Sequence, residues 1–110
     1  MPKLGDQIEK EMTILFSDIR NFTSLSEQIT PQENFNFINN YLSYMEPIIS
    51  QCNGFIDKYI GDAIMALFPN SADDALCGAI RMLEKLIEYN ECRQRCNYKT
   101  IEIGLGLKYW

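Results

Sequence analysis

Two aspartates stand at comparable places in two separate stretches of the sequence. Asp18 follows the apolar start of "FSDIRNFTSLSE", residues 16–27, and a polar turn comes directly after it. Asp62 separates two apolar runs in "GFIDKYIGDAIMALF", residues 54–68. If the fold brings the two carboxylates together, they repel each other unless a cation neutralises them, and their oxygen ligands suit Mg²⁺ or Mn²⁺. The pair is therefore a candidate metal site.

A purely structural explanation of the two aspartates stays open at this point. Aspartate is frequent at helix N-caps and in turns, so Asp18 can cap the helix that follows it and Asp62 can serve as a turn residue. Beside Asp18, however, the backbone amides of "RNFT", residues 20–23, lead into a predicted helix N-terminus, a feature that binds anions. A metal ion and a phosphate would then share one pocket.

The composition limits the chemistry that is open to the chain. With 110 residues it forms one domain, and its net charge of −5 argues against nucleic-acid binding, which needs a concentrated excess of Lys and Arg. The absence of histidine excludes Ser-His-Asp and Cys-His nucleophilic sites, and the four cysteines lack paired metal-ligand spacing. No apolar run approaches the ~20 residues of a membrane span, and the N-terminus lacks the apolar core of a signal peptide, so a cytoplasmic protein is expected.

The elements that must position the first aspartate can be predicted from local patterns. Residues 12–19 have the β-branched and aromatic content of a buried strand. A short helix is expected at 23–29, and the capping box "TPQE", residues 30–33, begins a longer helix that runs to about Ser50, with Pro47 as a kink or an early end. The buried stripe of this longer helix is expected at Phe35, Ile38, Leu42, Met45 and Ile49.

The second aspartate lies in a predicted hairpin. Strands at 55–60 and 63–68 flank Gly61 and Asp62, a two-residue connection with Gly in first position that suits a type II′ turn. Ser71 then caps a helix that runs to about residue 90. Its buried stripe is expected at Ala75, Leu76, Ala79, Ile80, Leu83 and Leu86. A last strand with one buried face is expected at 100–107, where apolar residues alternate with polar residues and glycines.

The order of these elements is strand, two helices, strand, strand, helix and strand. This order predicts an α+β fold, an antiparallel-type sheet of four strands with the helices on one face, known as the split βαβ or ferredoxin-like arrangement. The first and third strands lie in the middle of such a sheet. The end of the first strand, at Asp18, can then lie beside the hairpin tip that carries Asp62, and the two carboxylates can converge.

The two quoted stretches together resemble the class III adenylate/guanylate cyclase catalytic domain, and "IEIGLGL", residues 101–107, resembles the strand that this family places next. The resemblance extends over Met12 to Leu107. It implies a nucleotide cyclase type of fold and a reaction in which the ribose 3′-hydroxyl of a nucleoside triphosphate attacks the α-phosphorus and releases pyrophosphate. It also implies Mg²⁺ or Mn²⁺ as the cofactor, which lowers the pKa of that hydroxyl and neutralises phosphate charge.

The resemblance implies specific roles for residues of this chain. Asp18 and Asp62 match the metal-binding aspartates of the family, and Ile19 matches the residue whose backbone carbonyl binds one metal. The amides of the phosphate-holding turn match Asn21, Phe22 and Thr23. Many members have Gly where this chain has Asn21, but Asn also tolerates a positive φ angle, so the turn is expected to form.

Lys58 matches the base-reading lysine of adenylate-specific members, so the resemblance favours ATP over GTP as the substrate. Considered alone, Lys58 would be interpreted as a solvated strand lysine. Family members are dimers with active sites at the interface, which implies a homodimer or pairing with another cyclase domain. Each site draws its metal ligands from one chain and its base-binding and transition-state residues from the other.

The resemblance divides the chain into an N-terminal lead-in at 1–11, a partial cyclase catalytic domain at 12–107 and an atypical C-terminal tail at 108–110. The family carries its second base-selecting residue, its ribose-orienting Asn and its transition-state Arg in segments beyond this match. The expected function is therefore a metal-dependent conversion of ATP to cyclic AMP and pyrophosphate that is absent or weak in this chain alone. The alternative is a catalytically incomplete remnant that binds nucleotide or metal, or that dimerises.

The ending "LKYW", residues 107–110, departs from the family pattern of Leu, then Asn or His, then Thr-Gly. One adenine inserted into codons for Leu-Asn-Thr-Gly, TTA AAT ACT GG, gives TTA AAA TAC TGG, which encodes Leu-Lys-Tyr-Trp. A frameshift is therefore one hypothesis for this ending. A natural short variant or a cloned fragment is the alternative.

Overall fold

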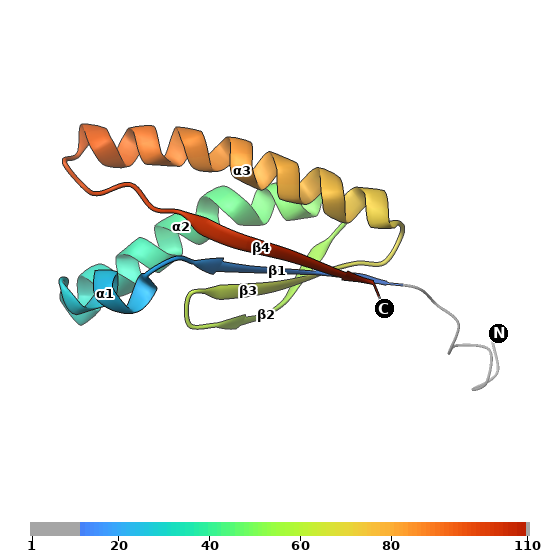
Figure 1. Ribbon diagram of the computed structural model, residues 1–110, viewed down its shortest axis with the longest axis horizontal. Coiled ribbons are helices and arrows are strands. Elements are labelled where there is room, and N and C mark those ends of the chain that lie inside the picture. Colours follow the sequence, from blue (N-terminus) through green and yellow to red (C-terminus); the bar gives the residue numbers. More distant parts are fainter. Residues whose placement is uncertain (1–11, 110) are drawn as a thin grey trace.

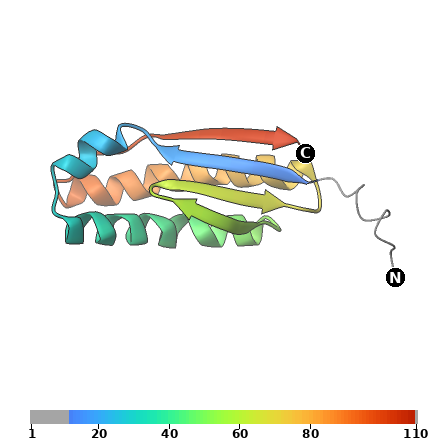
Figure 2. The same cartoon turned by 90° about the horizontal axis from the view of Figure 1, so that it is seen from below.

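The computed structural model describes residues 12–109 and contains a four-stranded antiparallel sheet with two long helices on one face (Figures 1 and 2). The predicted lead-in, residues 1–11, and Trp110 lie outside the described residues. The elements in chain order are β1 (Thr13–Ile19), α1 (Phe22–Glu27), α2 (Pro31–Gln51), β2 (Phe55–Ile60), β3 (Ala63–Phe68), α3 (Ala72–Arg95) and β4 (Ile103–Tyr109). The strand order is β2-β3-β1-β4, so the first and third strands are central and the predicted α+β fold is confirmed.

The helix starts follow from local chemistry. The backbone amide of Glu33 donates to Thr30 Oγ1 at 3.1 Å, and the amide of Thr30 donates to Glu33 Oε1 at 2.9 Å, which is the predicted capping box of α2. Ser71 caps α3 in the same way through the amide of Asp74. The expected early end at Pro47 is wrong, because α2 continues to Gln51. A proline removes a single backbone hydrogen bond, and the buried residues around it hold the helix on the sheet.

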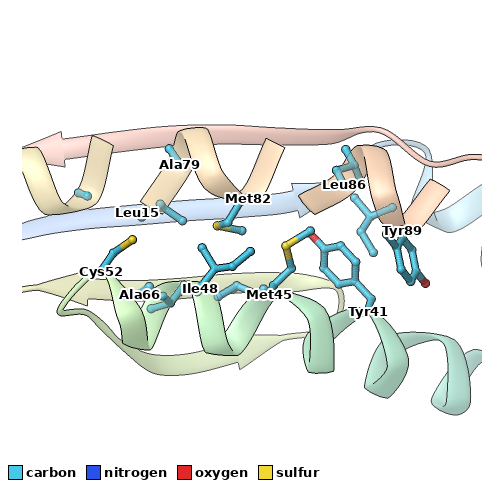
Figure 3. Close-up of a cluster of buried hydrophobic side chains, with 14 of the residues drawn as sticks. Leu15, Tyr41, Met45, Ile48, Cys52, Ala66, Ala79, Met82, Leu86 and Tyr89 are labelled. Carbon is cyan, nitrogen blue, oxygen red and sulfur yellow. The ribbon is translucent and has the colours of Figure 1, made fainter. Parts of the chain in front are cut away.

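The core lies between the two long helices and the sheet face that they cover. Side chains of α2 and α3 meet those of the central strands in one continuous cluster, in which Leu15, Met45 and Met82 are fully buried (Figure 3). The rings of Tyr41 and Tyr89 join the helices in an edge-on contact with centroids 5.8 Å apart. Each aliphatic side chain buried in this way stabilises the fold by roughly 1.5–3 kcal/mol.

The predicted buried stripes of the helices were partly wrong. On α2, Met45 and Ile49 are buried as expected, but Phe35 is 64% exposed. The side chains that α2 buries are Phe37, Tyr41, Met45, Ile48 and Ile49. Residues at spacings of three and four form two adjacent stripes on this helix, and the buried stripe is the one that contains Tyr41. The polar hydroxyl of Tyr41 makes this residue hard to identify as part of the core from the sequence.

On α3, the predicted burial of Ala75, Ala79 and Leu86 is confirmed, whereas Leu76, Ile80 and Leu83 are exposed. The side chains that α3 buries are Ala75, Gly78, Ala79, Met82, Leu86 and Tyr89. The sheet and α2 each cover one side of this helix, and no described element covers the side that carries the exposed aliphatic residues. The sequence pattern therefore predicted more burial than these elements supply.

The last strand begins later than predicted, at Ile103 instead of residue 100. Ile101 is buried, but its backbone pairs with a side chain: Asn90 Nδ2 donates to the Ile101 carbonyl at 2.9 Å, and the Ile101 amide donates to Asn90 Oδ1 at 2.8 Å. This amide side chain takes the place of a strand partner. At its other end, β4 continues through Lys108 and Tyr109, which pair with Ile14 and Thr13.

Candidate metal and phosphate site

The structure brings Asp18 and Asp62 to the same end of the sheet. β1 and β3 run antiparallel in a register that pairs Ser17 with Ile64, so the last residues of β1 lie next to the start of β3. The backbone amide of Ile19 donates to Asp62 Oδ2 at 2.8 Å across this junction. One hydrogen bond thus ties the tip of the β2–β3 hairpin to the residue that follows Asp18.

The hairpin tip has the backbone geometry that its sequence favours. Gly61 has a φ of +60°, and Asp62 is not among the described residues with positive φ, which is the pattern of a type II′ turn. A residue with a β-carbon is strained in the first position of such a turn. Gly61 therefore sets the turn that directs the Asp62 carboxylate toward the end of β1.

The oxygens of the two aspartates suit a hard divalent cation. Asp18 is exposed and Asp62 is half-buried, and Asp62 Oδ2 accepts the Ile19 amide while no donor to Asp18 or to Asp62 Oδ1 is found among residues 12–109. The same residues contain no cluster of three or more His, Cys, Asp or Glu side chains that could hold a metal. A cation here would use two carboxylates and complete its shell with a backbone carbonyl, water or ligand oxygens, as Mg²⁺ commonly does.

The turn after β1 presents unpaired amides at the start of α1. Asn21 adopts the left-handed conformation, with φ 56° and ψ 31°, and its side chain makes no capping hydrogen bond. Because the first amides of a helix have no acceptor within the helix, those of Phe22 and Thr23 remain available to a ligand. The Arg20 amide donates to the Glu102 carbonyl at 2.8 Å and holds the turn beside the residues that lead into β4.

Arg20 is a residue of this site that the sequence interpretation did not single out. A β-carbon on Gly104 would lie 2.7 Å from Arg20 Nη2 and 2.8 Å from Asp18 Oδ1, so both side chains approach the space above this glycine. Gly104 is the β4 partner of Asp18. The glycine leaves room for a guanidinium beside a candidate metal ligand, and its position opposite Asp18 is visible only when the strand register is known.

A β-bulge determines which face of the sheet Lys58 occupies. Ile56 pairs with Ala66, but the next pair is Lys58 with Met65, so Asp57 is an extra residue in β2. Met65 also pairs with Phe16, and directly opposed residues of antiparallel strands point to the same face. Lys58 therefore lies on the open face of the sheet, which also carries Asp18.

Lys58 and Asp18 are nevertheless apart within one chain. They are separated by two strand spacings across the sheet and two residues along it, which corresponds to about 12 Å between Cα atoms for standard strand geometry. The structure thus gathers Asp18, Ile19, Asp62 and the turn at Asn21 around one point, and it places Lys58 elsewhere on the same face. Lys58 and Asp18 therefore lie in separate parts of this surface.

Two buried hydroxyls lie on the helix side of the sheet beneath the aspartates. Ser17 is 3% exposed and Tyr41 1% exposed, and neither hydroxyl has a well-formed hydrogen-bond partner in the described part of the chain. Burial raises the pKa of Tyr41 to about 12, with the neighbouring Ser17 hydroxyl acting against this and the charges of Asp62 and Asp18 adding to it. The site is therefore open on one face of the sheet and closed by core residues on the other.

A separate hollow of about 540 Å³ lies between α1, α2 and the end of α3, away from the aspartates. Its lining includes Arg93, whose guanidinium carbon is 4.8 Å from the ring centre of Phe37 and 5.4 Å from that of Tyr98. Stacked in this way, the cation joins aromatic side chains of α2 and of the residues after α3. The hollow contains none of the residues expected to bind metal, phosphate or base.

The sequence and structure resemble known nucleotide cyclases. Residues 5–109 match the family described as the adenylate and guanylate cyclase catalytic domain. An adenylate cyclase of Anabaena cylindrica is 46% identical over 110 residues, which cover 96% of this chain and 22% of that protein. The terminal-differentiation specific adenylate cyclase of Dictyostelium discoideum is 45% identical over 109 residues, which cover 94% of this chain and 5% of that protein.

Solved structures agree with these relatives. The guanylyl cyclase Cya2 matches with a TM-score of 0.81 and 34% identity over 91% of this chain and 54% of that chain. The adenylyl cyclase CyaB from P. aeruginosa matches with a TM-score of 0.74 and 32% identity over 91% of this chain and 56% of that chain. The present chain thus spans little more than half of these solved chains. Within the described residues, no helix is both long enough and apolar enough to cross a membrane. From its sequence match and its fold, the chain belongs to the adenylate and guanylate cyclase catalytic domain family.

Proposed function

We propose that this chain holds the metal ion and the triphosphate of a nucleotide cyclase site that converts ATP to cyclic AMP and pyrophosphate. In this reaction the ribose 3′-oxygen forms a bond to the α-phosphorus, the bond from the α-phosphorus to the pyrophosphate oxygen breaks, and the 3′-hydroxyl loses its proton. The observation that carries the proposal is the 2.8 Å hydrogen bond from the Ile19 amide to Asp62 Oδ2. It holds Asp62 at the end of β1 beside Asp18, in a chain of the cyclase family.

The metal-binding residues of the proposal are Asp18, Asp62 and the backbone carbonyl of Ile19. Two carboxylates with free oxygen atoms at one end of the sheet fit Mg²⁺ or Mn²⁺, which take oxygen ligands and often share their shell with substrate phosphates. When bound, the ion neutralises phosphate charge and lowers the pKa of the 3′-hydroxyl. Without it, the two carboxylates would repel an anionic nucleotide.

The phosphate-binding groups of the proposal are the amides of Asn21, Phe22 and Thr23. The left-handed conformation of Asn21 and the absence of a side-chain cap support this assignment, because they leave the first amides of α1 exposed to a ligand. Arg20 adds a positive charge next to Asp18 above Gly104. A guanidinium there can donate to phosphate oxygens in a charge-assisted hydrogen bond.

The proposed base-binding residue is Lys58, and the proposed substrate is ATP in preference to GTP. Two relatives at 46% and 45% identity are both named adenylate cyclases, which supports this preference. Since Lys58 is about 12 Å from Asp18 within one chain by standard strand geometry, we assign it to the site of a partner molecule. The open sheet face would then be the pairing surface, with a second copy or another cyclase domain opposite.

The first test is cyclic nucleotide formation by the purified chain with ATP or GTP in the presence of Mn²⁺. Asp62→Asn is the test variant, and Asp57→Asn is the matched control, because Asp57 is an exposed aspartate of the same hairpin. Cyclic AMP formation that disappears in Asp62→Asn and persists in Asp57→Asn would support the proposal. Cyclic AMP formation above background that is equal in both variants would exclude Asp62 from the site.

A second candidate function is binding of metal and nucleotide without turnover. It is favoured by the separation of about 12 Å between Lys58 and Asp18, which keeps the proposed base-binding and metal-binding residues of one chain apart. This function predicts no cyclic nucleotide, together with a rise in melting temperature on addition of Mn²⁺ that requires both Asp18 and Asp62. If Mn²⁺ and ATP change neither product formation nor melting temperature, both candidates are wrong.

A further inference from the structure

Two of the four cysteines, Cys52 and Cys77, are in direct contact although they are 25 residues apart in the sequence. Their sulfur atoms lie 3.7 Å apart. Cys52 is the C-cap of α2, and Cys77 lies in the second turn of α3. Both are free thiols. The contact therefore pairs two thiols from the two helices that cover the sheet.

The backbones of the two helices come close together at this point. A β-carbon added to Gly78, the residue after Cys77, would lie 3.8 Å from the β-carbon of Cys52. The two β-carbons of a disulfide are about 3.5–4.5 Å apart, so α3 passes Cys52 at the distance that a covalent link between the helices needs. Rotation of the two side chains about their Cα–Cβ bonds can then bring the sulfurs together without rebuilding either helix.

The two thiols differ in their access to solvent. Cys77 is exposed, whereas Cys52 is 4% exposed and belongs to the core cluster (Figure 3). A guanidinium lies beside the buried sulfur: Arg81 Nη1 is 3.6 Å from Cys52 Sγ, and Arg81 Nη2 donates to Gln51 Oε1 at 2.7 Å. A cation stabilises the negative charge that a sulfur carries when it attacks a disulfide. A reagent in solution can thus reach Cys77 first, and Cys52 is placed to react second.

We propose that Cys52 and Cys77 form a redox-active dithiol that reacts with small disulfides such as oxidised glutathione. The thiolate of Cys77 attacks one sulfur of the small disulfide, so that a mixed disulfide forms and one thiol leaves. Cys52 then attacks the Cys77 sulfur, the mixed disulfide breaks and the second thiol leaves. In total the two protein thiols lose two electrons and two protons, and the small disulfide takes up both and becomes two thiols.

The two steps differ in speed. The hydrogen bond with Cys52 raises the pKa of Cys77 above its ordinary value, burial adds to this, and the charge of Arg81 acts against it. Fewer Cys77 thiolates are then present near pH 8 than for an ordinary exposed thiol, which slows the first attack. The second attack is intramolecular and joins sulfurs that are already in contact. The mixed disulfide should therefore not accumulate.

The other two cysteines lack this arrangement. Cys92 and Cys96 are four residues apart at the end of α3, and residues at this helical spacing have β-carbons about 5–6 Å apart, too far for a disulfide in an intact helix. Because Cys96 is exposed, it would take up glutathione independently of the pair. The double variant Cys92→Ser with Cys96→Ser removes this background reaction and leaves the proposed dithiol unchanged, so it is the parent for the experiment.

The inference does not depend on the proposed cyclase reaction, and its experiment measures covalent products without activity. The parent is incubated with oxidised glutathione, and its intact mass and linked peptides are determined. It should lose two hydrogens, keep no glutathione and yield a peptide in which Cys52 is joined to Cys77. With Cys52→Ala added, glutathione should remain on Cys77. With Cys77→Ser added, the reaction should be at least about tenfold slower, because the remaining thiol is buried.

A comparison with the unfolded parent keeps the inference testable if a cysteine variant does not fold. In urea that unfolds the chain, the mixed disulfide should accumulate and the link between Cys52 and Cys77 should form at least about tenfold more slowly, because the contact between the sulfurs is lost. The link closes a loop that contains the whole β2–β3 hairpin, so the oxidised parent should melt at least about 8 °C higher than the reduced one.

Three results would overturn the inference. The first is a folded parent that keeps glutathione on Cys77 or forms disulfides only between molecules. The second is a link that forms equally fast in the folded and unfolded chains. The third is an oxidised parent that melts below the reduced one, which would mean that the native helix packing does not accept the link.

Discussion

The hydrogen bond from the Ile19 amide to Asp62 Oδ2 makes a quantitative prediction about two substitutions of one residue. Asp62→Ala removes the acceptor, whereas Asp62→Asn keeps an oxygen at the same place and removes only the charge. Hydrogen bonds to charged groups contribute roughly 1.5–3 kcal/mol, and the half-buried position of Asp62 puts this one at the lower end because solvent screens the charge. We expect Asp62→Ala to lose about 1.5 kcal/mol of the free energy of unfolding and Asp62→Asn about 0.5 kcal/mol.

Urea unfolding in the absence of metal measures this difference. The midpoint should fall in both variants without a change in the slope, since neither substitution alters the surface exposed on unfolding. For a domain of this size, 1 kcal/mol corresponds to a change in melting temperature of about 4–8 °C. Loss of a like charge beside Asp18 acts in the opposite direction, so the expected losses are upper limits for the measured ones.

Adding Mn²⁺ separates the structural role of Asp62 from its proposed role as a ligand. At ten times the dissociation constant, a ligand that binds only the folded chain stabilises it by about 1.4 kcal/mol, or about 6–11 °C in melting temperature. The wild-type chain and Asp57→Asn should show this shift, and Asp62→Asn should not. A full Mn²⁺-induced shift in Asp62→Asn would refute Asp62 as a metal ligand. If Asp62→Asn and Asp62→Ala lose the same free energy of unfolding in urea, the hydrogen bond from the Ile19 amide is not what holds the Asp62 side chain in place.

Three further predictions concern glycines and a buried hydroxyl. Gly104→Ala should displace the flexible ends of the exposed Arg20 and Asp18 side chains at little cost in the free energy of unfolding, and it should reduce the Mn²⁺-induced thermal shift. An unchanged shift in a Mn²⁺ titration would contradict a role for the side-chain arrangement above this glycine in metal binding. Gly54→Ala should cost at least about 1–3 kcal/mol in urea unfolding, because its β-carbon would overlap the buried ring of Phe68, and a midpoint equal to wild type would contradict that packing. Tyr41→Phe removes a buried hydroxyl without a well-formed partner, so it should leave stability unchanged or raise it by up to about 1 kcal/mol near pH 7. Burial raises the pKa of Tyr41 from 10.0 to about 12. The protonated phenol therefore contributes stability that is complete below pH 10 and is lost as the pH rises to about 12. The fall in urea midpoint between about pH 9 and pH 11 should accordingly be smaller in Tyr41→Phe than in wild type.

Several features of the fold were predictable from the sequence because short-range chemistry determines them. The strands of the hairpin begin and end at the predicted residues, since Gly61 is the residue that accepts positive φ at the first position of a two-residue turn. The capping box at Thr30 and Glu33 specified the start of α2 in the same local way. The order of these elements left few arrangements open, and the central position of the first and third strands followed.

Part of the candidate site was equally visible in the sequence. Asp18 and Asp62 each stand at the end of a strand or in a tight turn, and the predicted topology places those two points at one end of the sheet. Asn21 tolerates the left-handed conformation that the turn requires, and the structure shows that conformation. These positions depend only on which strands are neighbours and on the direction in which each runs.

The remaining features depend on register and on layers, which local sequence does not encode. A bulge at Asp57 puts Lys58 on the open face, and a regular strand would have placed Asp57 there, because the side-chain period of two reverses faces with a shift of one residue. Arg20 joins the site through the pairing of Asp18 with Gly104, two residues that are far apart in the chain.

The helix stripes show the same limit. The apolar pattern of α3 predicts burial of Leu76, Ile80 and Leu83. Such a pattern indicates which sides of a helix are suited to burial, but it does not show which element covers each side. Only the tertiary structure shows which of those elements residues 12–109 provide: the sheet and α2 cover two sides, and the flank beyond β4 remains uncovered. Local sequence determined the helices and strands of this protein and placed the two aspartates at strand ends. Strand register and contacts between layers join residues that are distant in the chain, so only the tertiary structure decided which side chains share a face and which face stays open.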